Sequence, residues 1–310
     1  MNIAGLAISV AALVHLASFV LMLYRVDPFY HFFYDFAWWT YIVFLAGVNH
    51  RLGRNSLLFD RPREFVWVFL LSTPVWLLFE AYNFRLNNWF YVGVPLETHI
   101  RWPGYFVAFG TVLPGLFETA TFLENTGLFR RLRGRSLKVS RALHVRFIVI
   151  GILMMAAPLI RPDFFFPLVW LGLIFLLDPI VYRWGDRTLS YSGQAEGGDY
   201  SRAALLLVAG MICGLLWEFW NFWAGSKWVY TVPHLDFLNI FEMPLLGFFG
   251  FPPFALECYL IYQAFVMFRR RFLQGGVGIP VLTAVLFLVY CLCVFRGIDE
   301  KTVAVYRFVG

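Results

Sequence analysis

The chain has 310 residues, of which 60% are hydrophobic and 14% are charged, and its formal net charge is +6. Soluble globular chains average about 45–50% apolar and about 25% charged residues. This composition therefore excludes a soluble domain and a disordered or collagen-like chain, and we expect an integral membrane protein. In such a protein an excess of basic residues orients loops across the bilayer, so we expect no nucleic-acid partner.

The first apolar run covers residues 3–24. No Lys or Arg precedes it and no small-residue cleavage site follows it, which indicates a retained transmembrane helix rather than a signal peptide. The sequence also lacks an organelle-targeting signal, which favours a bacterial inner (cytoplasmic) membrane.

Further apolar segments follow along the chain. A bilayer core of about 30 Å requires roughly 20 apolar residues per helix. Nine segments approach this requirement, in chain order 3–24, 33–49, 65–83, 104–124, 146–160, 164–182, 203–223, 244–267 and 278–295. The fifth is short enough to be a partial span. The expected fold class is an all-α polytopic membrane protein.

Basic residues are distributed unevenly between the loops. Most of them lie after even-numbered segments, as in Arg51, Arg54 and the stretch 130–141. The positive-inside rule places these loops in the cytoplasm, and we place the N-terminus outside. We interpret 130–141 as a topogenic loop that contacts anionic lipid, with a dedicated partner site as the alternative.

The chain resembles itself at an offset of about 130–140 residues. Five short matches occur in the same order in both halves, at positions 25–29 and 161–165, 51–53 and 183–185, 79–84 and 217–222, 89–91 and 228–230, and 114–118 and 253–257. We predict two parallel four-helix repeats, residues 1–140 and 141–272, followed by an additional helix and short tail, residues 273–310. Ligand sites of transporters with such repeats lie at the repeat interface.

Four glutamates in or near apolar segments are the candidate catalytic acids and bases: Glu80, Glu118, Glu218 and Glu257. A carboxylate inside a bilayer costs at least about 2.5–3.5 kcal/mol on insertion scales and tends to face the bundle interior. Two such residues in each repeat predict a polar centre. The alternative is that they hold the bundle together through interhelical hydrogen bonds or salt bridges.

Two prolines accompany the deeper pair of glutamates. Pro114 and Pro253 lie four residues before Glu118 and Glu257, and each removes a backbone donor. We expect a kink near each proline and expect the eighth span, 244–267, to be broken.

Six residues are candidate substrate-binding residues. Asn83 and Asn221 each lie three residues after a candidate glutamate and share its helix face. The remaining four follow in the predicted outer loops: Trp89, Tyr91, Trp228 and Tyr230. Such residues are typical of an interfacial aromatic belt. The alternative is that the loops fold back over the pocket and line it.

Several motifs are absent from the sequence. We find no HExxH, Walker loop, GxGxxG opening a helix, GxSxG or DDxxD motif. His31 and Asp35 have the spacing of a metal-ligand pair but no counterpart in the second repeat. We therefore expect no metal and no cofactor.

The order of these motifs resembles the integral-membrane lycopene cyclases of the heterodimeric bacterial and fungal fusion type. That family has W-D, then W-(x)-Y, then P-x-E-E, which Trp217-Glu218, Trp228-Val229-Tyr230 and Pro253-x-x-x-Glu257 would match. Here Cys258 replaces the second acid and the spacing from the proline differs. The resemblance implies a proton-initiated cyclisation of an isoprenoid that enters from the lipid, with Trp and Tyr faces stabilising the carbocation.

We therefore predict a membrane-embedded lipid enzyme that cyclises or isomerises an isoprenoid or carotenoid-like substrate at the repeat interface. One alternative is a proton-coupled transporter or flippase of a hydrophobic substrate. Another is a non-catalytic membrane subunit, which would bind a membrane partner or form an oligomer.

Overall fold

Helices make up 76% of the computed structural model, which describes residues 3–235, 238–273 and 278–304. The all-α class is confirmed. Eight helical segments of the described chain are long and apolar enough to cross a membrane, namely Ile3–Leu23 (α1), Pro62–Leu86 (α4), Thr98–Asn125 (α5 and α6), Arg141–Ile160 (α7), Pro162–Trp184 (α8, η1 and α9), Ser201–Trp223 (α11), Leu245–Phe272 (η3 and α12) and Gly278–Lys301 (α13). These lengths and compositions are those of an integral membrane protein.

The second predicted span is helix α2, Phe33–Gly53. It has 21 residues and packs beside α1, but it carries several polar residues, including Asn49, His50 and Arg51. Helix α7 begins at Arg141, earlier than expected, because the Ser140 hydroxyl accepts a hydrogen bond from the amide of Leu143. The fifth segment is therefore a full-length helix rather than a partial one.

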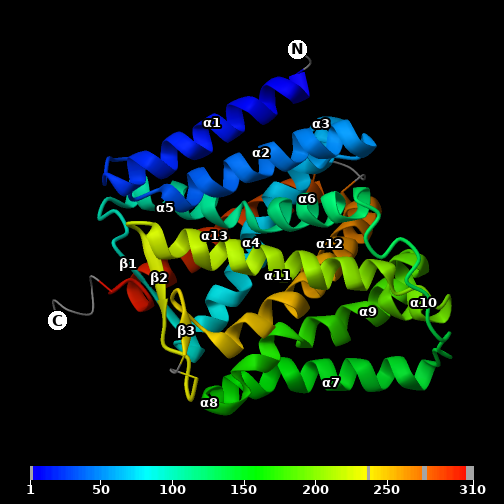
Figure 1. The fold of residues 1–310 in the computed structure, drawn as a ribbon. Coiled ribbons are helices and arrows are strands. Elements are labelled where there is room, and N and C mark those ends of the chain that lie inside the picture. The colour runs from blue at the N-terminus through cyan, green and yellow to red at the C-terminus, as the bar shows by residue number, and fades with distance from the viewer. Residues whose placement is uncertain (1–2, 236–237, 274–277, 305–310) are drawn as a thin grey trace.

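The long helices run side by side and divide the molecule into two ends (Figure 1). The strand end holds β1 (Trp89–Val92) and β2 (Lys227–Tyr230), and the basic end holds α3 (Leu57–Asp60), α10 (Tyr191–Glu196) and the linker 126–140. The remaining short elements are η2 (Arg187–Leu189), β3 (Asn239–Ile240) and β4 (Met243–Pro244).

The start of α1 lies at the basic end (Figure 1). Gly47, near the end of α2, is within van der Waals reach of Ala4 and Ile8. Because α1 and α2 run in opposite directions, the start of α1 lies at the same end of the molecule as the loop that follows α2. The expectation of an N-terminus outside together with basic loops in the cytoplasm is therefore wrong, since both lie at one end.

Two spans are interrupted at corresponding places. The fourth predicted span consists of α5 (Thr98–Phe109) and α6 (Val112–Asn125), separated by Gly110 and Thr111. Pro114 has no amide to donate to the carbonyl of Gly110, four residues earlier. In the eighth span the 3₁₀ helix η3 (Leu245–Gly250) gives way to α12 (Phe251–Phe272), three residues before Pro253. The expected disturbance near both prolines is confirmed.

The sixth predicted span, 164–182, is interrupted as well. It consists of α8 (Pro162–Phe165), η1 (Phe166–Trp170) and α9 (Gly172–Trp184). The segment is therefore not the uninterrupted helix expected from the sequence, although Pro162–Trp184 as a whole is long and apolar enough to cross a membrane.

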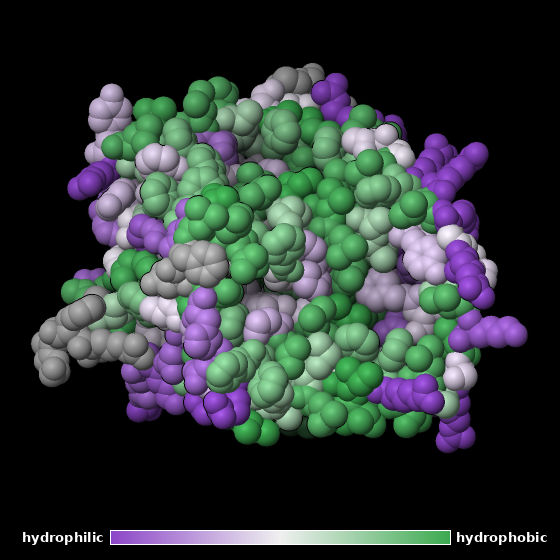
Figure 2. Space-filling model, turned by 60° about the horizontal axis from the view of Figure 1, so that its bottom comes forward, coloured by the Kyte–Doolittle hydropathy of each residue, from purple (hydrophilic) through white to green (hydrophobic). Residues whose placement is uncertain are grey.

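The surface matches a membrane location. Figure 2 shows hydrophobic side chains across the middle of the visible face and hydrophilic ones gathered at its two ends. Exposed apolar residues are most frequent along α1, α7 and α13, which are the helices that a bilayer would cover.

Candidate functional site

The first polar cluster surrounds Glu80, near the end of α4. This side chain is fully buried. Its Oε1 accepts hydrogen bonds from the indoles of Trp76 (2.8 Å) and Trp89 (3.1 Å) and from the hydroxyl of Tyr91 (2.5 Å). Its Oε2 is enclosed and has no hydrogen-bond partner among the described residues.

The second cluster surrounds Glu218, near the end of α11. It is also fully buried, and its Oε1 accepts a hydrogen bond of 2.7 Å from the hydroxyl of Tyr230. Its Oε2 is enclosed and likewise unpaired within the described chain. Each cluster thus joins a glutamate to the tyrosine of the strand that follows its helix.

The two candidate asparagines hold these strands. Asn83 donates to the carbonyl of Trp89 at 2.8 Å and accepts from the amide of Trp89 at 3.3 Å. Asn221 makes the same pair of bonds with Trp228, both at 2.9 Å. The asparagines therefore fix the strand backbone, and their amides are occupied by protein groups.

Strands β1 and β2 pair with each other in antiparallel register, Trp89 opposite Tyr230 and Tyr91 opposite Trp228. The loops from the two halves of the chain therefore fold back together over the bundle. The structure supports this alternative over a simple interfacial belt, because Trp89 and Tyr91 are buried and all four aromatic residues line cavities.

Two cavities lie beneath these strands. The first is bordered by residues of α2 and α5, including Tyr34, Asp35 and Tyr105, and by Tyr91. The second is bordered by residues of η1, η3 and α12, including Trp170 and Phe254, and by Trp89 and Tyr230. Each encloses about 70 Å³.

Three tryptophans form walls common to both cavities: Trp76, Trp217 and Trp228. The rings of Trp76 and Trp217 lie 4.9 Å apart between centroids, inclined at 45°. Aromatic faces carry negative potential and attract cations, so this arrangement suits an apolar ligand on which positive charge develops.

Both strand tyrosines remain protonated at neutral pH. Burial raises the pKa of Tyr91 and of Tyr230 well above the usual value, and the neighbouring glutamates raise it further. The two hydroxyls therefore act as hydrogen-bond donors to Glu80 and Glu218.

Glu118 lies far from these clusters, towards the basic end. One oxygen accepts from the Ser56 hydroxyl and from the amides of Leu57 and Leu58, at the start of α3, and the other accepts from Asn49. These bonds satisfy the free amides of a helix N-terminus. This arrangement favours a structural role for Glu118.

Asp178 of α9 likewise accepts hydrogen bonds from the free amides at the start of a short helix, in the other half of the chain. It accepts from the amides of Tyr191 and Ser192, at the start of α10. This role of Asp178 could not be predicted from the internal matches. Glu118 lies in α6, in the fourth span of the first half, whereas Asp178 lies in α9, in the second span of the second half.

Glu257 occupies a different place again, in α12. Its Oε1 accepts a hydrogen bond of 2.9 Å from the amide of Leu173, in the first turn of α9, and its Oε2 is enclosed with no partner in the described part of the chain. Within the described residues no hydrogen bond or ion pair joins any two of the four candidate glutamates. The four candidate glutamates thus have separate hydrogen-bond partners.

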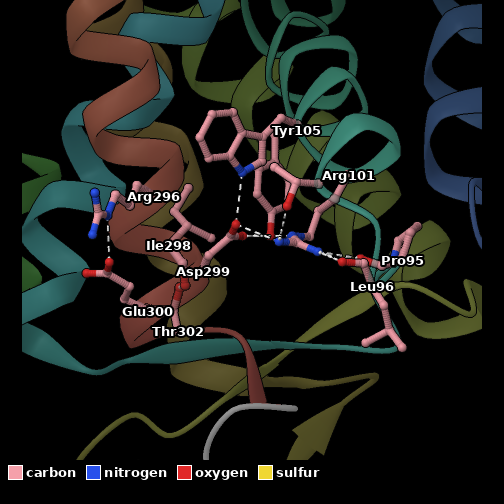
Figure 3. A network of polar contacts seen from close by, with 11 residues as sticks. Pro95, Leu96, Arg101, Tyr105, Arg296, Ile298, Asp299, Glu300 and Thr302 are labelled. Atoms are coloured by element: carbon pink, nitrogen blue, oxygen red, sulfur yellow. Dashed lines mark hydrogen bonds and ion pairs between the residues drawn. The ribbon is translucent and has the colours of Figure 1, made fainter.

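A further network fastens α13 beside the first cavity. Asp299 accepts hydrogen bonds from Arg101, Trp102 and Tyr105 of α5 (Figure 3). The carbonyl of Thr302 then accepts a bond from the amide of Tyr91. Asp299 and Thr302 are thus bonded to Arg101, Tyr105 and Tyr91, three residues that line the first cavity.

Sequence reasoning missed several cavity residues. Trp76 lies four residues before Glu80 on the same helix, and this spacing places the two side chains on one face. Its contact with Glu80 could therefore have been predicted from the sequence. Trp170 and Phe254 carry no comparable signal. His31 hydrogen-bonds Asp27 rather than pairing with Asp35, and no group of three or more potential ligands for a metal occurs within the described ranges.

Comparisons with protein-family models, with curated proteins and with solved structures found no match. The assignment of a function therefore depends on the geometry of the two cavities and of the carboxylates beside them.

Proposed function

We propose that this protein is a membrane-embedded enzyme that binds an apolar isoprenoid-type chain in the two cavities and cyclises or isomerises it by acid chemistry. The observation that carries the proposal is the pair of hydroxyls on Tyr91 and Tyr230. Each borders a tryptophan-walled cavity and is hydrogen-bonded to an enclosed glutamate. The resemblance of the sequence motifs to membrane lycopene cyclases points in the same direction.

The chemistry conserves mass. One proton is added to a carbon–carbon double bond, which leaves a carbocation on the neighbouring carbon. A second double bond attacks this cation and closes a ring, and one proton then leaves an adjacent carbon. The faces of Trp76, Trp217 and Trp228 stabilise the cation. Glu80 and Glu218 hold and return the proton through the tyrosine hydroxyls.

We further propose that residues 1–140 and 141–272 are two copies of one four-helix unit, followed by α13. The matched bonds of Glu80 and Glu218, and of Asn83 and Asn221, support this. Antiparallel pairing of equivalent strands is what a two-fold axis along the membrane normal would produce. On this proposal the two cavities are equivalent sites, one in each copy.

We propose a bacterial inner membrane with the basic end in the cytoplasm, so that the start of α1 is cytoplasmic and the strands face outward. The linker 130–141 would then contact anionic lipid headgroups.

A proton-coupled transporter or flippase is the second candidate. The interruptions at Gly110–Thr111 and at Gly250 favour it, because broken helices at membrane depth line cavities in transporters. A non-catalytic subunit would instead co-purify with a membrane partner.

The test compares lipid extracts of an isoprenoid-accumulating bacterium that expresses the wild-type chain, Glu80→Gln or Glu218→Gln. Glu97→Gln, at an exposed position, is the matched control. We expect a new isomer of unchanged mass with the wild type and the control, and clearly less of it with each buried variant, because each variant disables one of the two sites. Identical extracts from all four, with each protein folded in the membrane, would contradict the proposal. Flux assays in proteoliposomes would then test transport.

A further inference from the structure

A long groove runs along the lipid-facing side of the first half of the chain. Its volume is about 920 Å³, and it is lined by α1, α2 and α5 with almost entirely apolar side chains. Its α1 wall consists of Ile3, Leu6, Ala7, Val10, Ala11 and Val14. Since α1 is among the candidate membrane spans, the groove opens to the hydrocarbon of the bilayer.

The groove adjoins the first cavity. Phe32, Asp35 and Gly104 line both spaces. Gly104 has no side chain to fill the junction, and a Cβ added there would come within 3.1 Å of the ring of Phe32. These three residues therefore form the boundary that the two spaces share, and a chain in the groove would enter the cavity between them.

Asp35 is the acid at this junction. Its Oδ1 is enclosed and lacks a hydrogen-bond partner among the described residues. An enclosed polar atom without a partner is costly, so Asp35 is a candidate for a functional role. Glu80 and Glu218 lie behind tyrosines, whereas Asp35 itself borders the space that a ligand would fill.

We propose that an isoprenoid-type hydrocarbon chain enters from the bilayer through this groove and places its terminal unit in the first cavity, against Asp35. Asp35 then touches the reacting carbons and is a catalytic residue of the first cavity. The inference rests on the proposed function for the reaction, but the route of entry can be measured without any turnover.

The probe is a C20 isoprenoid hydrocarbon that carries a diazirine at one end, incorporated into proteoliposomes with the full chain. After irradiation, labelled peptides are mapped by mass spectrometry. We expect labels on the groove walls and, in the first cavity, on Tyr34 and Tyr105. Labelling at the same level on the exposed face of α13 as in the groove would indicate bulk lipid contact and would overturn the proposal.

Two variants test the route. Gly104→Leu fills the junction, and we expect it to lose the labels at Tyr34 and Tyr105 at least tenfold while keeping the groove labels. Ala7→Trp fills the groove and should reduce both sets of labels. Ala12→Trp is the matched control, since Ala12 is exposed on α1 outside the groove. Unchanged cavity labels in Gly104→Leu would refute the route.

Asp35→Asn separates the chemical role from the route. We expect it to keep the wild-type labels and to lose the isomeric product of the first cavity, which lowers the total amount of isomer. Product formation by Asp35→Asn at the wild-type rate would refute the catalytic role. If the wild type itself forms no isomer, the proposed function and the role of Asp35 fail together, while the labelling still decides the route.

Discussion

Tyr91 and Trp228 lie directly opposite each other across the antiparallel pair of β1 and β2, and both border the first cavity. The next opposed aromatic pair, Trp89 and Tyr230, borders the second cavity. The register of one short strand pair therefore supplies a wall to each site. Because alternate residues of a strand point to the same face, the W-x-Y spacing places both rings of each strand toward the bundle.

Replacing each strand tyrosine by phenylalanine removes the hydroxyl that reaches a buried glutamate. We expect Tyr230→Phe and Tyr91→Phe each to lose product formation at one of the two sites while the protein still folds. Each loses up to about 1–3 kcal/mol of stability, the cost of leaving a buried acceptor without its hydrogen bond. Tyr91→Phe should lose less, because Trp76 and Trp89 still donate to Glu80. Thermal unfolding in detergent measures this difference, and Tyr24→Phe at an exposed position is the control.

Removal of Glu118 should affect folding rather than chemistry. Glu118→Leu leaves the start of α3 without its acceptor, and we expect a loss of about 1–3 kcal/mol for each buried donor left without a partner. Glu257→Leu removes a carboxyl with one hydrogen bond from Leu173 and should cost less. Unfolding temperatures of the two variants test this order, and equal stability would argue against the capping role.

Gly93, directly after β1, should resist substitution. Its φ is +66°, and a Cβ there would lie 2.1 Å from the carbonyl oxygen of Gly225. Gly127 is the matched control, since its φ is +83° with open space around it. We expect Gly127→Ala to cost about 1–2 kcal/mol from the left-handed backbone alone and Gly93→Ala to cost clearly more. Similar unfolding temperatures would mean that β1 and β2 separate at little cost.

The ion pair of Arg101 and Asp299 should anchor α13 (Figure 3). Asp299→Leu leaves the guanidinium of Arg101 buried, with an exposed fraction of 3%, and we expect a loss of about 3–5 kcal/mol. Glu300→Leu breaks the exposed pair with Arg296 and should cost at most about 1 kcal/mol. The temperature of thermal unfolding in detergent measures the difference between the two variants.

Acidification should loosen the basic linker. Hydrogen bonds from the backbone amide and side chain of Ser201 hold the pKa of Asp199 below its usual value, and Arg133 lowers it further. The folded form is therefore stabilised above the unfolded pKa, and this stabilisation is lost as the pH falls below about 4. The protection factors of residues 130–141, which correct for the intrinsic pH dependence of amide exchange, should fall at low pH in the wild type. Asp199→Asn should show low protection factors already at pH 7 and little further change.

The sequence by itself determined the class and the positions of the helices. Long apolar runs can be satisfied in a bilayer only as helices or closed barrels, so span prediction needs no tertiary information. The prolines before Glu118 and Glu257 predicted the interruptions, because the loss of a backbone donor depends only on the residue itself. Glu80 with Asn83, and Glu218 with Asn221, were recognised as recurring pairs from helical spacing alone.

The tertiary structure alone decided what each acid does. The four glutamates look alike in sequence, yet Glu118 caps a helix, Glu257 binds a backbone amide, and Glu80 and Glu218 stand behind tyrosines. These partners come from residues distant in the chain, so spacing cannot reveal them. Asp35 became a candidate because the packing of α1, α2 and α5 leaves an open groove beside it, and such a void has no local sequence signal.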